Sequence, residues 1–242
     1  MAKRIGEISA IYRYPVKSFG GERLEGCELE EYGLHGDRVC SFYDETKEGW
    51  NRFVTARTIP NMLSYQASYE NEGVRVNGPD GKRYSWDDQL LEQIQALSRK
   101  KLSSSAMFAP NPENDELLSV DAASLLLLTD KTVKRIEAKW GKELDALRFR
   151  PNLMLKLETQ EEGEQSWIGR RIRVGNAELQ IDSDCERCSM ITIDPGTLER
   201  DPSLLRQVHE HFQLNVGVYA STVKTGYIRD GDPVYLLDES PV

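Results

Sequence analysis

The sequence lacks long hydrophobic runs. Its longest uninterrupted apolar stretch is Leu125–Leu128, whereas a membrane-spanning helix needs about 20 apolar residues. The basic start at Lys3 and Arg4 is not followed by the apolar stretch of a secretory signal, because Glu7 interrupts it at once. We therefore expect no membrane crossing and a cytoplasmic location.

Blocks of positive charge are also absent. The chain carries a formal net charge of −9 and an isoelectric point near 5.0, so it lacks the electrostatic footprint of a protein that binds nucleic acid or an anionic membrane. We expect neither as a partner. Arginines and lysines that are separated in sequence can still assemble a local basic pocket.

Cysteine and histidine are scarce, with four cysteines and three histidines in 242 residues. Reducing conditions in the cytosol oppose disulfides, so these cysteines suit reaction or metal binding better than a disulfide framework. Hydrophobic residues make up 39% and charged residues 29% of the chain, which is ordinary for a globular protein. The length suits one large β-rich domain or two small ones.

Short strand-like segments separated by Gly, Asn and Pro dominate the sequence. They include residues 8–12, 39–43, 153–157, 172–174, 178–181 and 233–237. A hairpin is predicted where 74–76 and 83–85 flank Asp80-Gly81, because Asp-Gly readily takes the positive φ of tight turns. The pattern predicts a mainly β protein with a few helices, of the α+β class.

Three helices are predicted. Apolar residues at helical spacing indicate one within 86–100, capped by Asp87. A second is predicted over 121–140, with Asp121 as its N-cap and Gly141 beyond its end, and a third starts at Asp201-Pro202. The polar stretches 103–105 and 110–114 indicate a surface loop or a junction between two subdomains.

Two cysteines, Cys185 and Cys188, stand at the end of one strand-like run and the start of another. A lone Cys-x-x-Cys is ordinarily a pair of free thiols or half a zinc site, but no second short-spaced pair supplies further zinc ligands. The β-branched surroundings disfavour a thioredoxin-like redox pair. A Cys188 thiolate beside Arg187 would be stabilised, which favours nucleophilic reaction or metal binding.

Basic residues recur within loop-like segments beside Ser, Thr, Gly or Asn. The segments are 14–18, 36–38, 55–57 and 148–152. Each basic residue alone is typical of a solvated surface charge. Together they suit an anionic ligand that carries a phosphate and polar ring edges.

The order of these motifs resembles that of MOSC proteins with an N-terminal β-barrel domain. The motifs are Tyr14-Pro15-Val16-Lys17-Ser18, Gly36-Asp37-Arg38, Phe53-Val54-Thr55-Ala56-Arg57, Phe149-Arg150-Pro151-Asn152, Cys185-Glu186-Arg187-Cys188 with Asp194-Pro195, and Gly231-Asp232-Pro233-Val234. They span nearly the whole chain. Similar proteins are the mitochondrial amidoxime-reducing component, its bacterial counterparts and the C-terminal domain of molybdenum cofactor sulfurase.

The resemblance implies an N-terminal MOSC β-barrel domain over residues 1–100 and a MOSC β-barrel domain over 101–242. It implies a molybdenum cofactor of the molybdopterin type and a reductase for N-hydroxylated or related N–O and S–O compounds. The chain stops soon after Gly231–Val234, so we expect a separate electron-donor protein. A sulfur carrier with a Cys188 persulfide, a cofactor-handling protein and a non-enzymatic cofactor-binding module stay open as alternatives, as does pyridoxal phosphate binding at the level of the family.

The same matching implies roles for individual residues. Cys188 would be the catalytic residue and the protein ligand of molybdenum, whereas Cys185 would be a companion that does not bind the metal. The residues that would hold the pterin and its phosphate are Lys17, Ser18, Arg38, Arg150 and Asn152, with Arg57 and Asp121 nearby.

The chain departs from the resemblance at Ala122-Ala123, where the amidoxime reductases carry hydroxyl residues that touch the cofactor. Ser124, or a backbone amide at the start of the helix predicted there, would have to replace those contacts. Asp121 and Asp194 are the candidates for a general acid, although Asp-Pro after a strand is more typical of a turn.

Overall fold

The computed structural model describes residues 2–158 and 163–237, and its largest element is a closed β-barrel. Its strands are β1 (Lys3–Arg13), β10 (Leu125–Thr129), β11 (Leu153–Leu157), β12 (Arg171–Val174), β13 (Ala177–Glu186), β14 (Asn215–Lys224) and β16 (Pro233–Leu236). The ring closes because β1 pairs with both β16 and β11. Neighbouring strands are antiparallel except β10 and β11, which are parallel. The mainly β fold predicted from the sequence is confirmed.

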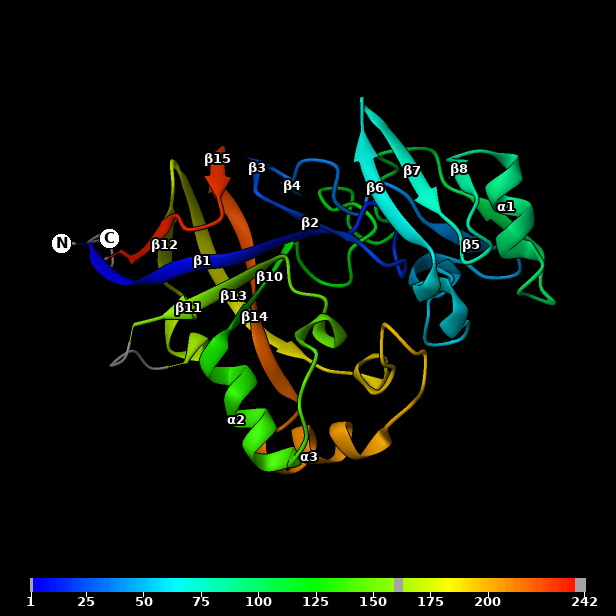
Figure 1. Cartoon of the computed structure of the whole chain (residues 1–242). Coiled ribbons are helices and arrows are strands. Elements are labelled where there is room, and N and C mark those ends of the chain that lie inside the picture. The colour runs from blue at the N-terminus through cyan, green and yellow to red at the C-terminus, as the bar shows by residue number, and fades with distance from the viewer. Residues whose placement is uncertain (1, 159–162, 238–242) are drawn as a thin grey trace.

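Side chains at alternate positions of the strands point into the barrel and fill it. In β12, Ile172 and Val174 are fully buried, whereas Arg171 and Arg173 are exposed, which is the period-2 pattern of a strand with one face in a core. Helices α2 (Asp130–Trp140) and α3 (Pro202–Phe212) pack outside the barrel around a second apolar cluster that includes Ile136. Figure 1 shows both helices below the strands.

A smaller unit lies beside the barrel (Figure 1). It contains β5 (Phe42–Asp44), β6 (Gln66–Glu70), β7 (Gly73–Asn77), β8 (Arg83–Ser85), α1 (Asp88–Gln95), β9 (Leu102–Ser104) and the 3-10 turns η1 (Gly49–Arg52) and η2 (Pro60–Ser64). The predicted hairpin is confirmed as β7 and β8, with Gly81 at a φ of +78°. Asp87 caps α1 and Asp201 caps α3 through side-chain hydrogen bonds to backbone amides, as predicted.

The first strand of the chain belongs to the barrel, not to the smaller unit. β1 carries Ile5, Ile8 and Ile11 into the barrel core, and β2 (Glu22–Leu24) extends its pairing. A side sheet joins β3 (Gly26–Glu30) to β4 (Gly33–Leu34) and to β15 (Gly226–Arg229) near the other end of the chain. The division of the chain at residue 100 stays a prediction, and strand pairing crosses it several times.

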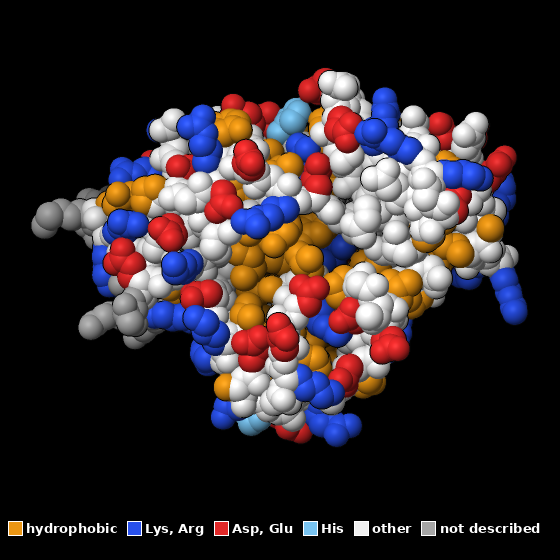
Figure 2. Space-filling view, in the orientation of Figure 1, with side chains coloured by type: hydrophobic (Ala, Val, Ile, Leu, Met, Phe, Trp, Pro, Cys, Tyr) orange, Lys and Arg blue, Asp and Glu red, His pale blue; other side chains and the backbone are white. Residues whose placement is uncertain are grey.

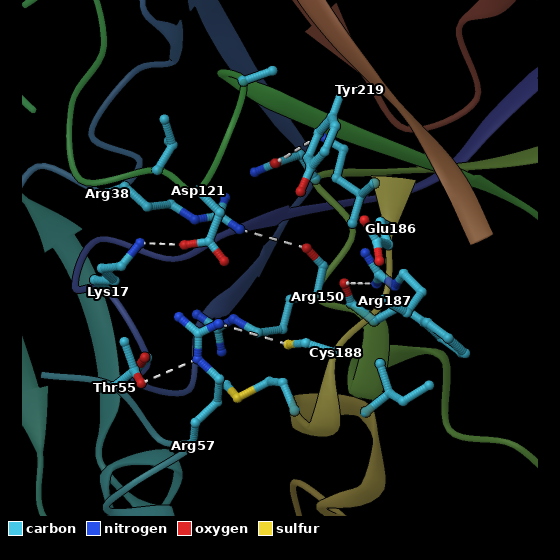
Figure 3. Close-up of a pocket in the computed structure, with 18 of the residues that line it drawn as sticks. Lys17, Arg38, Thr55, Arg57, Asp121, Arg150, Glu186, Arg187, Cys188 and Tyr219 are labelled. Carbon is cyan, nitrogen blue, oxygen red and sulfur yellow. Dashed lines mark hydrogen bonds and ion pairs between the residues drawn. The ribbon is translucent and has the colours of Figure 1, made fainter. Parts of the chain in front are cut away.

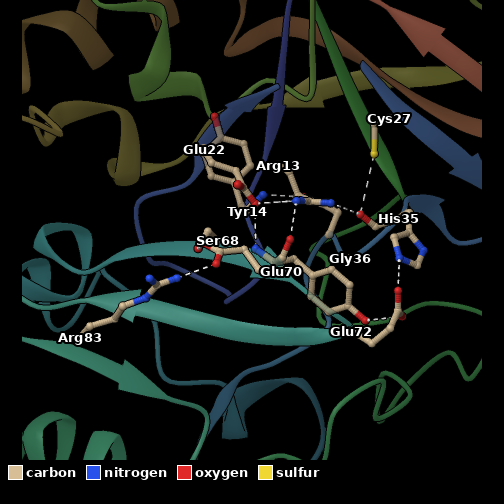
Figure 4. A network of polar contacts seen from close by, with 12 residues as sticks. Arg13, Tyr14, Glu22, Cys27, His35, Gly36, Ser68, Glu70, Glu72 and Arg83 are labelled. Carbon is tan, nitrogen blue, oxygen red and sulfur yellow. Dashed lines mark hydrogen bonds and ion pairs between the residues drawn. The ribbon is translucent and has the colours of Figure 1, made fainter. Parts of the chain in front are cut away.

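A buried polar network ties the barrel to the smaller unit (Figure 4). Arg13 of β1 donates to Glu22 Oε1 at 2.9 Å, to the carbonyl of His35 at 2.9 Å and to the carbonyl of Tyr69 on β6 at 2.8 Å. Each bond has a charged donor, so each is stronger than a neutral one. The network holds the two units in the arrangement that forms the pocket described below.

The helix predicted over 121–140 is wrong in its first half. Leu125–Leu128 lie within β10, between β14 and β11, and all four are buried. A strand covered on both faces reads as a continuous apolar run, which periodicity cannot distinguish from a buried helix. The helix starts only at Asp130, with Thr129 as its N-cap, and ends at Gly141 in the left-handed conformation.

Two further local predictions need correction. Val39 and Cys40 lie outside regular strands, and only Phe42 and Tyr43 of the predicted segment 39–43 belong to β5. Ser103 and Ser104, expected in a loop or junction, form β9 and pair with β5. Burial against the core of the smaller unit overrides the turn preference of serine there.

Glu164 is a fully buried carboxyl group beside the start of α2. Its Oε2 accepts hydrogen bonds from Thr129 Oγ1 at 2.6 Å and Thr132 Oγ1 at 2.7 Å, whereas its Oε1 has no partner within residues 2–158 and 163–237. Burial raises the pKa of Glu164 above its ordinary value of 4.5, and the threonine hydrogen bonds offset only part of this. The folded protein therefore binds this proton more strongly than the unfolded chain does.

The stabilisation from protonated Glu164 is complete below the unfolded pKa and is lost as pH rises through the folded pKa. We expect the unfolding free energy of Glu164→Gln to rise relative to that of the wild type as the pH increases from below 4.5, the ordinary pKa of a glutamate, to neutrality. Chemical denaturation across this range measures the gain. The exposed Glu143→Gln is the control, and parallel pH curves for the Glu164→Gln and wild-type proteins would contradict the assignment.

Candidate functional site

A pocket with a volume of about 120 Å³ lies where the open end of the barrel faces the smaller unit. In the orientation of Figure 1, Figure 2 shows the surface hollowed between the two units, with hydrophobic side chains on its wall and Lys or Arg atoms deeper inside. All eight residues singled out from the sequence line this pocket. They are Lys17, Ser18, Arg38, Arg57, Asp121, Arg150, Asn152 and Cys188.

Three of these residues adopt a backbone conformation that is uncommon for side chains other than glycine. Ser18, Arg38 and Arg150 have φ values of 68°, 48° and 55°, which lie in the left-handed region. Such conformations cost free energy and persist where the surrounding structure enforces them, often at binding sites. Because all three residues line the same pocket, this region has the character of a binding site.

Arg38 and Arg150 share an aromatic neighbour, Tyr14. Their guanidinium carbons lie 4.6 and 4.2 Å from the centre of the Tyr14 ring. Arg38 also forms a short ion pair with the buried Asp37, and Arg150 Nη1 donates to the carbonyl of Phe19 at 2.7 Å. Arg150 Nη2 is buried and has no hydrogen-bond partner among the described residues.

Burial, together with the positive charge of Arg38, lowers the pKa of Arg150 to about 10. Arg150 still stays protonated at neutral pH. A buried charged donor without a partner is costly, so the Nη2 group of Arg150 provides a place for an acceptor from a ligand.

The Tyr14 ring is expected to contribute more to the stability of the protein than its hydroxyl group, which is buried without a partner among the described residues. Tyr14→Phe should leave the unfolding free energy unchanged or raise it by up to about 1 kcal/mol, because an unsatisfied polar group is removed. Tyr14→Leu should lower it by about 2 kcal/mol or more, since two cation–π contacts disappear. Urea denaturation compares them, and equal losses in the two variants would refute this explanation.

Lys17 is almost fully buried and is held on several sides. Its Nζ donates to the carbonyl of Ser119 at 3.0 Å, forms a short ion pair with Asp121, and lies 4.5 Å from the centre of the Trp50 ring. Burial lowers the pKa of Lys17, and the Asp121 carboxylate offsets part of that effect. Burial alone would raise the pKa of Asp121, but the charge and hydrogen bond of Lys17 outweigh it and lower that pKa. Asp121 is therefore a carboxylate at neutral pH, not a proton donor.

Asn152 lies on the pocket wall with its polar atoms largely engaged. Its Oδ1 accepts from the amide of Leu126 at 3.1 Å, and its Nδ2 donates to the carbonyl of Tyr12 at 3.2 Å. These bonds connect β10 to β1 across the end of the barrel. The side chain thus helps to shape the pocket.

Cys188 is the exposed cysteine of the four, whereas Cys27, Cys40 and Cys185 are buried. Burial raises the pKa of Cys27 to about 11, which keeps that thiol protonated at neutral pH. Cys188 instead faces the pocket, directly after β13 and at the start of the 3-10 turn η5 (Ser189–Thr192). The strand-like run predicted after Cys188 is therefore a turn.

The cation beside Cys188 is Arg57, not its sequence neighbour Arg187 (Figure 3). Arg57 Nη1 lies 3.9 Å from Cys188 Sγ, and the backbone carbonyl of Arg57 accepts a hydrogen bond from Arg200 at 3.0 Å. Arg187 points to the buried side and donates to Cys185 Sγ and to the carbonyl of Phe149, each at 2.5 Å. Successive side chains of an extended segment face opposite sides, which corrects the sequence-based pairing of Arg187 with Cys188.

The structure also removes two of the residues considered from the sequence. Asp194 lies outside the pocket lining, pairs with Arg148 at 2.7 Å, and accepts hydrogen bonds from the amides of Gly196 and Thr197 as a turn residue. Ser124 is buried ahead of β10 and starts no helix. Neither the general-acid role of Asp194 nor a helix N-terminus at Ser124 is compatible with these positions.

Sequence reasoning missed Tyr219 and Glu186, which both line the pocket. Tyr219 lies on β14 between the buried Val218 and Ala220, so the alternation of that strand could have placed it on the opposite face. Burial raises the pKa of Tyr219 strongly, and the neighbouring Cys185 raises it further. Glu186 follows the same alternation between Cys185 and Arg187.

Two family models together match almost the whole chain. The MOSC N-terminal beta barrel domain matches residues 5–124 and the MOSC domain matches residues 114–235. The chain therefore belongs to the family of MOSC-domain proteins that carry an N-terminal MOSC β-barrel domain, which confirms the resemblance found from its motifs. The barrel takes its strand β1 from outside the region matched by the MOSC model.

Curated relatives are similar at low identity. Mitochondrial amidoxime-reducing component 1 of Danio rerio is 25% identical over 97% of this chain and 86% of its own length. Mitochondrial amidoxime reducing component 2 of Homo sapiens is 25% identical over 97% and 84%. Molybdenum cofactor sulfurase of Bombyx mori is 30% identical over 65% of this chain and 20% of its own length.

A crystal structure of the YuaD protein from Bacillus subtilis shares the fold. It superposes with a TM-score of 0.52 and 14% identity over 98% of each chain. Across the described ranges 2–158 and 163–237, no helix is long and apolar enough to cross a membrane.

Proposed function

We propose that this pocket binds a molybdenum cofactor of the molybdopterin type and that the protein reduces N-hydroxylated or related N–O and S–O compounds. The observation that carries the proposal is the convergence of eight residues, chosen from the sequence, on one pocket. These residues come from six separate segments of the chain. The resemblance suggests that these residues bind the cofactor. Their positions around one pocket are a separate observation, which depends on the fold alone.

The donors of the pocket fit an anionic cofactor. Six cationic side chains line the pocket against two carboxylates, although the chain as a whole has a net charge of −9. Carboxylates neutralise Lys17, Arg38 and Arg148 in ion pairs, and repulsion among the remaining cations is reduced when an anion binds between them. The unpartnered Nη2 of Arg150 is a donor that a phosphate oxygen would satisfy.

Residue roles follow from these positions. Lys17, Arg38 and Arg150 would bind the phosphate and polar edges of the cofactor, with Ser18 beside them. Cys188 would be the protein ligand of the metal, because its sulfur is exposed toward the pocket and thiolates bind soft metals well. Arg57 lies against that sulfur and would orient it.

When bound, the cofactor would supply a redox metal at which an oxygen atom is removed from the substrate. For an N-hydroxylated amine the balanced change is R–NHOH + 2 electrons + 2 protons giving R–NH₂ + H₂O. The electrons would come from a separate donor protein. Asp121, held as a carboxylate by Lys17, would accept hydrogen bonds rather than donate the protons.

The test is metal analysis and activity of protein produced in a host that makes molybdenum cofactor. We expect about one molybdenum per chain and reduction of N-hydroxybenzamidine with a chemical electron donor such as reduced methyl viologen. Purified protein that contains neither molybdenum nor pterin from such a host would overturn the proposal.

A sulfur-carrier function is the second candidate, and the exposure of Cys188 favours it. An accessible thiol with a cation at 3.9 Å can also carry a persulfide, and one relative is named a molybdenum cofactor sulfurase. Mass spectrometry distinguishes the two functions. An added sulfur atom on Cys188 without molybdenum would support the carrier and contradict the reductase.

A further inference from the structure

Glu186 is the carboxylate of the pocket that no cation neutralises. Of the two carboxylates in the pocket lining, Asp121 is paired with Lys17. Glu186 is exposed, and its carboxylate makes no ion pair or side-chain hydrogen bond with any residue in the described part of the chain. The binding of an anionic cofactor does not explain why this otherwise cationic pocket contains an unpaired carboxylate.

Backbone geometry places Glu186 on the same side as Cys188. Burial alternates strictly through this segment: Cys185 and Arg187 are buried, whereas Glu186 and Cys188 are exposed. The contact between Arg187 and Cys185 Sγ at 2.5 Å shows that these two share the buried side. Cys188 continues the extended conformation with φ −110° and ψ −175°. Figure 3 shows Glu186 and Cys188 at the same wall of the pocket.

The separation of these two residues suits a small substrate. Residues i and i+2 of an extended chain lie about 7 Å apart at their Cα atoms. A molecule whose oxygen is removed beside the Cys188 sulfur would therefore lie within reach of the Glu186 carboxylate. A carboxylate accepts two parallel N–H bonds from planar nitrogen groups, and it offers nothing to a group without donors.

We propose that Glu186 is a specificity-determining residue, which selects substrates that carry N–H donors or a positive charge next to the oxygen being removed. This inference rests on the proposed reductase function and names the substrate class of that site. N-hydroxyamidines and N-hydroxyguanidines belong to this class, whereas sulfoxides and tertiary amine N-oxides do not. For an N-hydroxyamidine the change is RC(NH₂)=NOH + 2 electrons + 2 protons giving RC(NH₂)=NH + H₂O. Glu186 binds the amino group and transfers no proton in this assignment.

The experiment compares two substrates in the molybdenum-loaded wild type, in Glu186→Gln and in Glu178→Gln. Glu178 lies on the same strand, outside the pocket lining, and its side chain makes no hydrogen bond or ion pair with a described residue, so Glu178→Gln is the matched control. We expect Glu186→Gln to lower kcat/KM for N-hydroxybenzamidine about tenfold, mainly through KM. Its kcat/KM for methyl phenyl sulfoxide should stay within about twofold of the wild type.

Equilibrium binding of benzamidine to the loaded protein without reductant gives a second measurement. Benzamidine carries the amidine group but no oxygen, so its affinity reports recognition separately from reduction. Glu186→Gln should weaken its binding about tenfold, and Glu178→Gln should leave it unchanged.

The outcomes distinguish a failure of the role of Glu186 from a failure of the proposed reductase function. Equal losses for both substrates, or unchanged selectivity and unchanged benzamidine binding, would overturn the role of Glu186 while the reductase function stands. Reduction of neither substrate by the molybdenum-loaded wild type would overturn the proposed function and this assignment with it.

Discussion

Replacing Cys188 by serine is expected to reduce the molybdenum content of the purified protein to below about a tenth of the wild-type level. The serine oxygen is a harder ligand and stays protonated at neutral pH, so it cannot replace the thiolate donor. The fold should persist, because Cys188 is exposed and packs into none of the three apolar clusters. Elemental analysis, with a thermal melt to verify folding, measures the effect.

Cys185→Ala is the control for this prediction. Cys185 is 1% exposed, and its sulfur accepts a hydrogen bond from Arg187 on the buried side of the segment. The variant should lose about 1–3 kcal/mol of stability, because a buried charged donor loses its partner, and should keep its molybdenum. Loss of metal from Cys185→Ala with full retention by Cys188→Ser would reverse the assignment of the ligand.

Replacing Arg150 by alanine is expected to weaken cofactor binding by about 10- to 150-fold. This range follows from losing a charge-assisted hydrogen bond of about 1.5–3 kcal/mol, and Arg150 Nη2 is the buried donor that awaits an acceptor. Pterin content after extended dialysis, measured by fluorescence of the oxidised pterin, gives the retained fraction.

The matched control is Arg171→Ala, an exposed arginine on β12 outside the pocket lining. It changes the net charge of the protein by the same amount and should leave pterin retention unchanged. A similar loss in both variants would mean that overall charge, and not the donor at Arg150, governs retention.

Local sequence patterns were sufficient for several elements. Asp87 before a helical apolar pattern and Asp201 before proline both predicted N-caps that the structure contains. Asp80-Gly81 predicted the turn of the β7–β8 hairpin. These predictions succeed because caps and tight turns depend on side chains within a few residues of each other.

The start of α2 was predicted incorrectly for the opposite reason. Leu125–Leu128 fit a helical face and a doubly covered strand equally well, and pairing with β14 and β11 decides between them. Those strands lie far away in the sequence. The sequence of residues 121–140 alone therefore does not indicate that pairing.

The sequence was enough to select the residues of the candidate site, because their motifs occur in a recognisable order and their chemistry suits an anionic, metal-containing ligand. It could not show which cation contacts Cys188. Arg187 is adjacent in the chain, but strand alternation turns it to the buried side, toward Cys185. Arg57 comes from a segment more than a hundred residues earlier and reaches the sulfur through the packing of the smaller unit against the barrel. The sequence therefore determines the types and the order of the residues, whereas the packing of distant segments determines which charged groups come into contact.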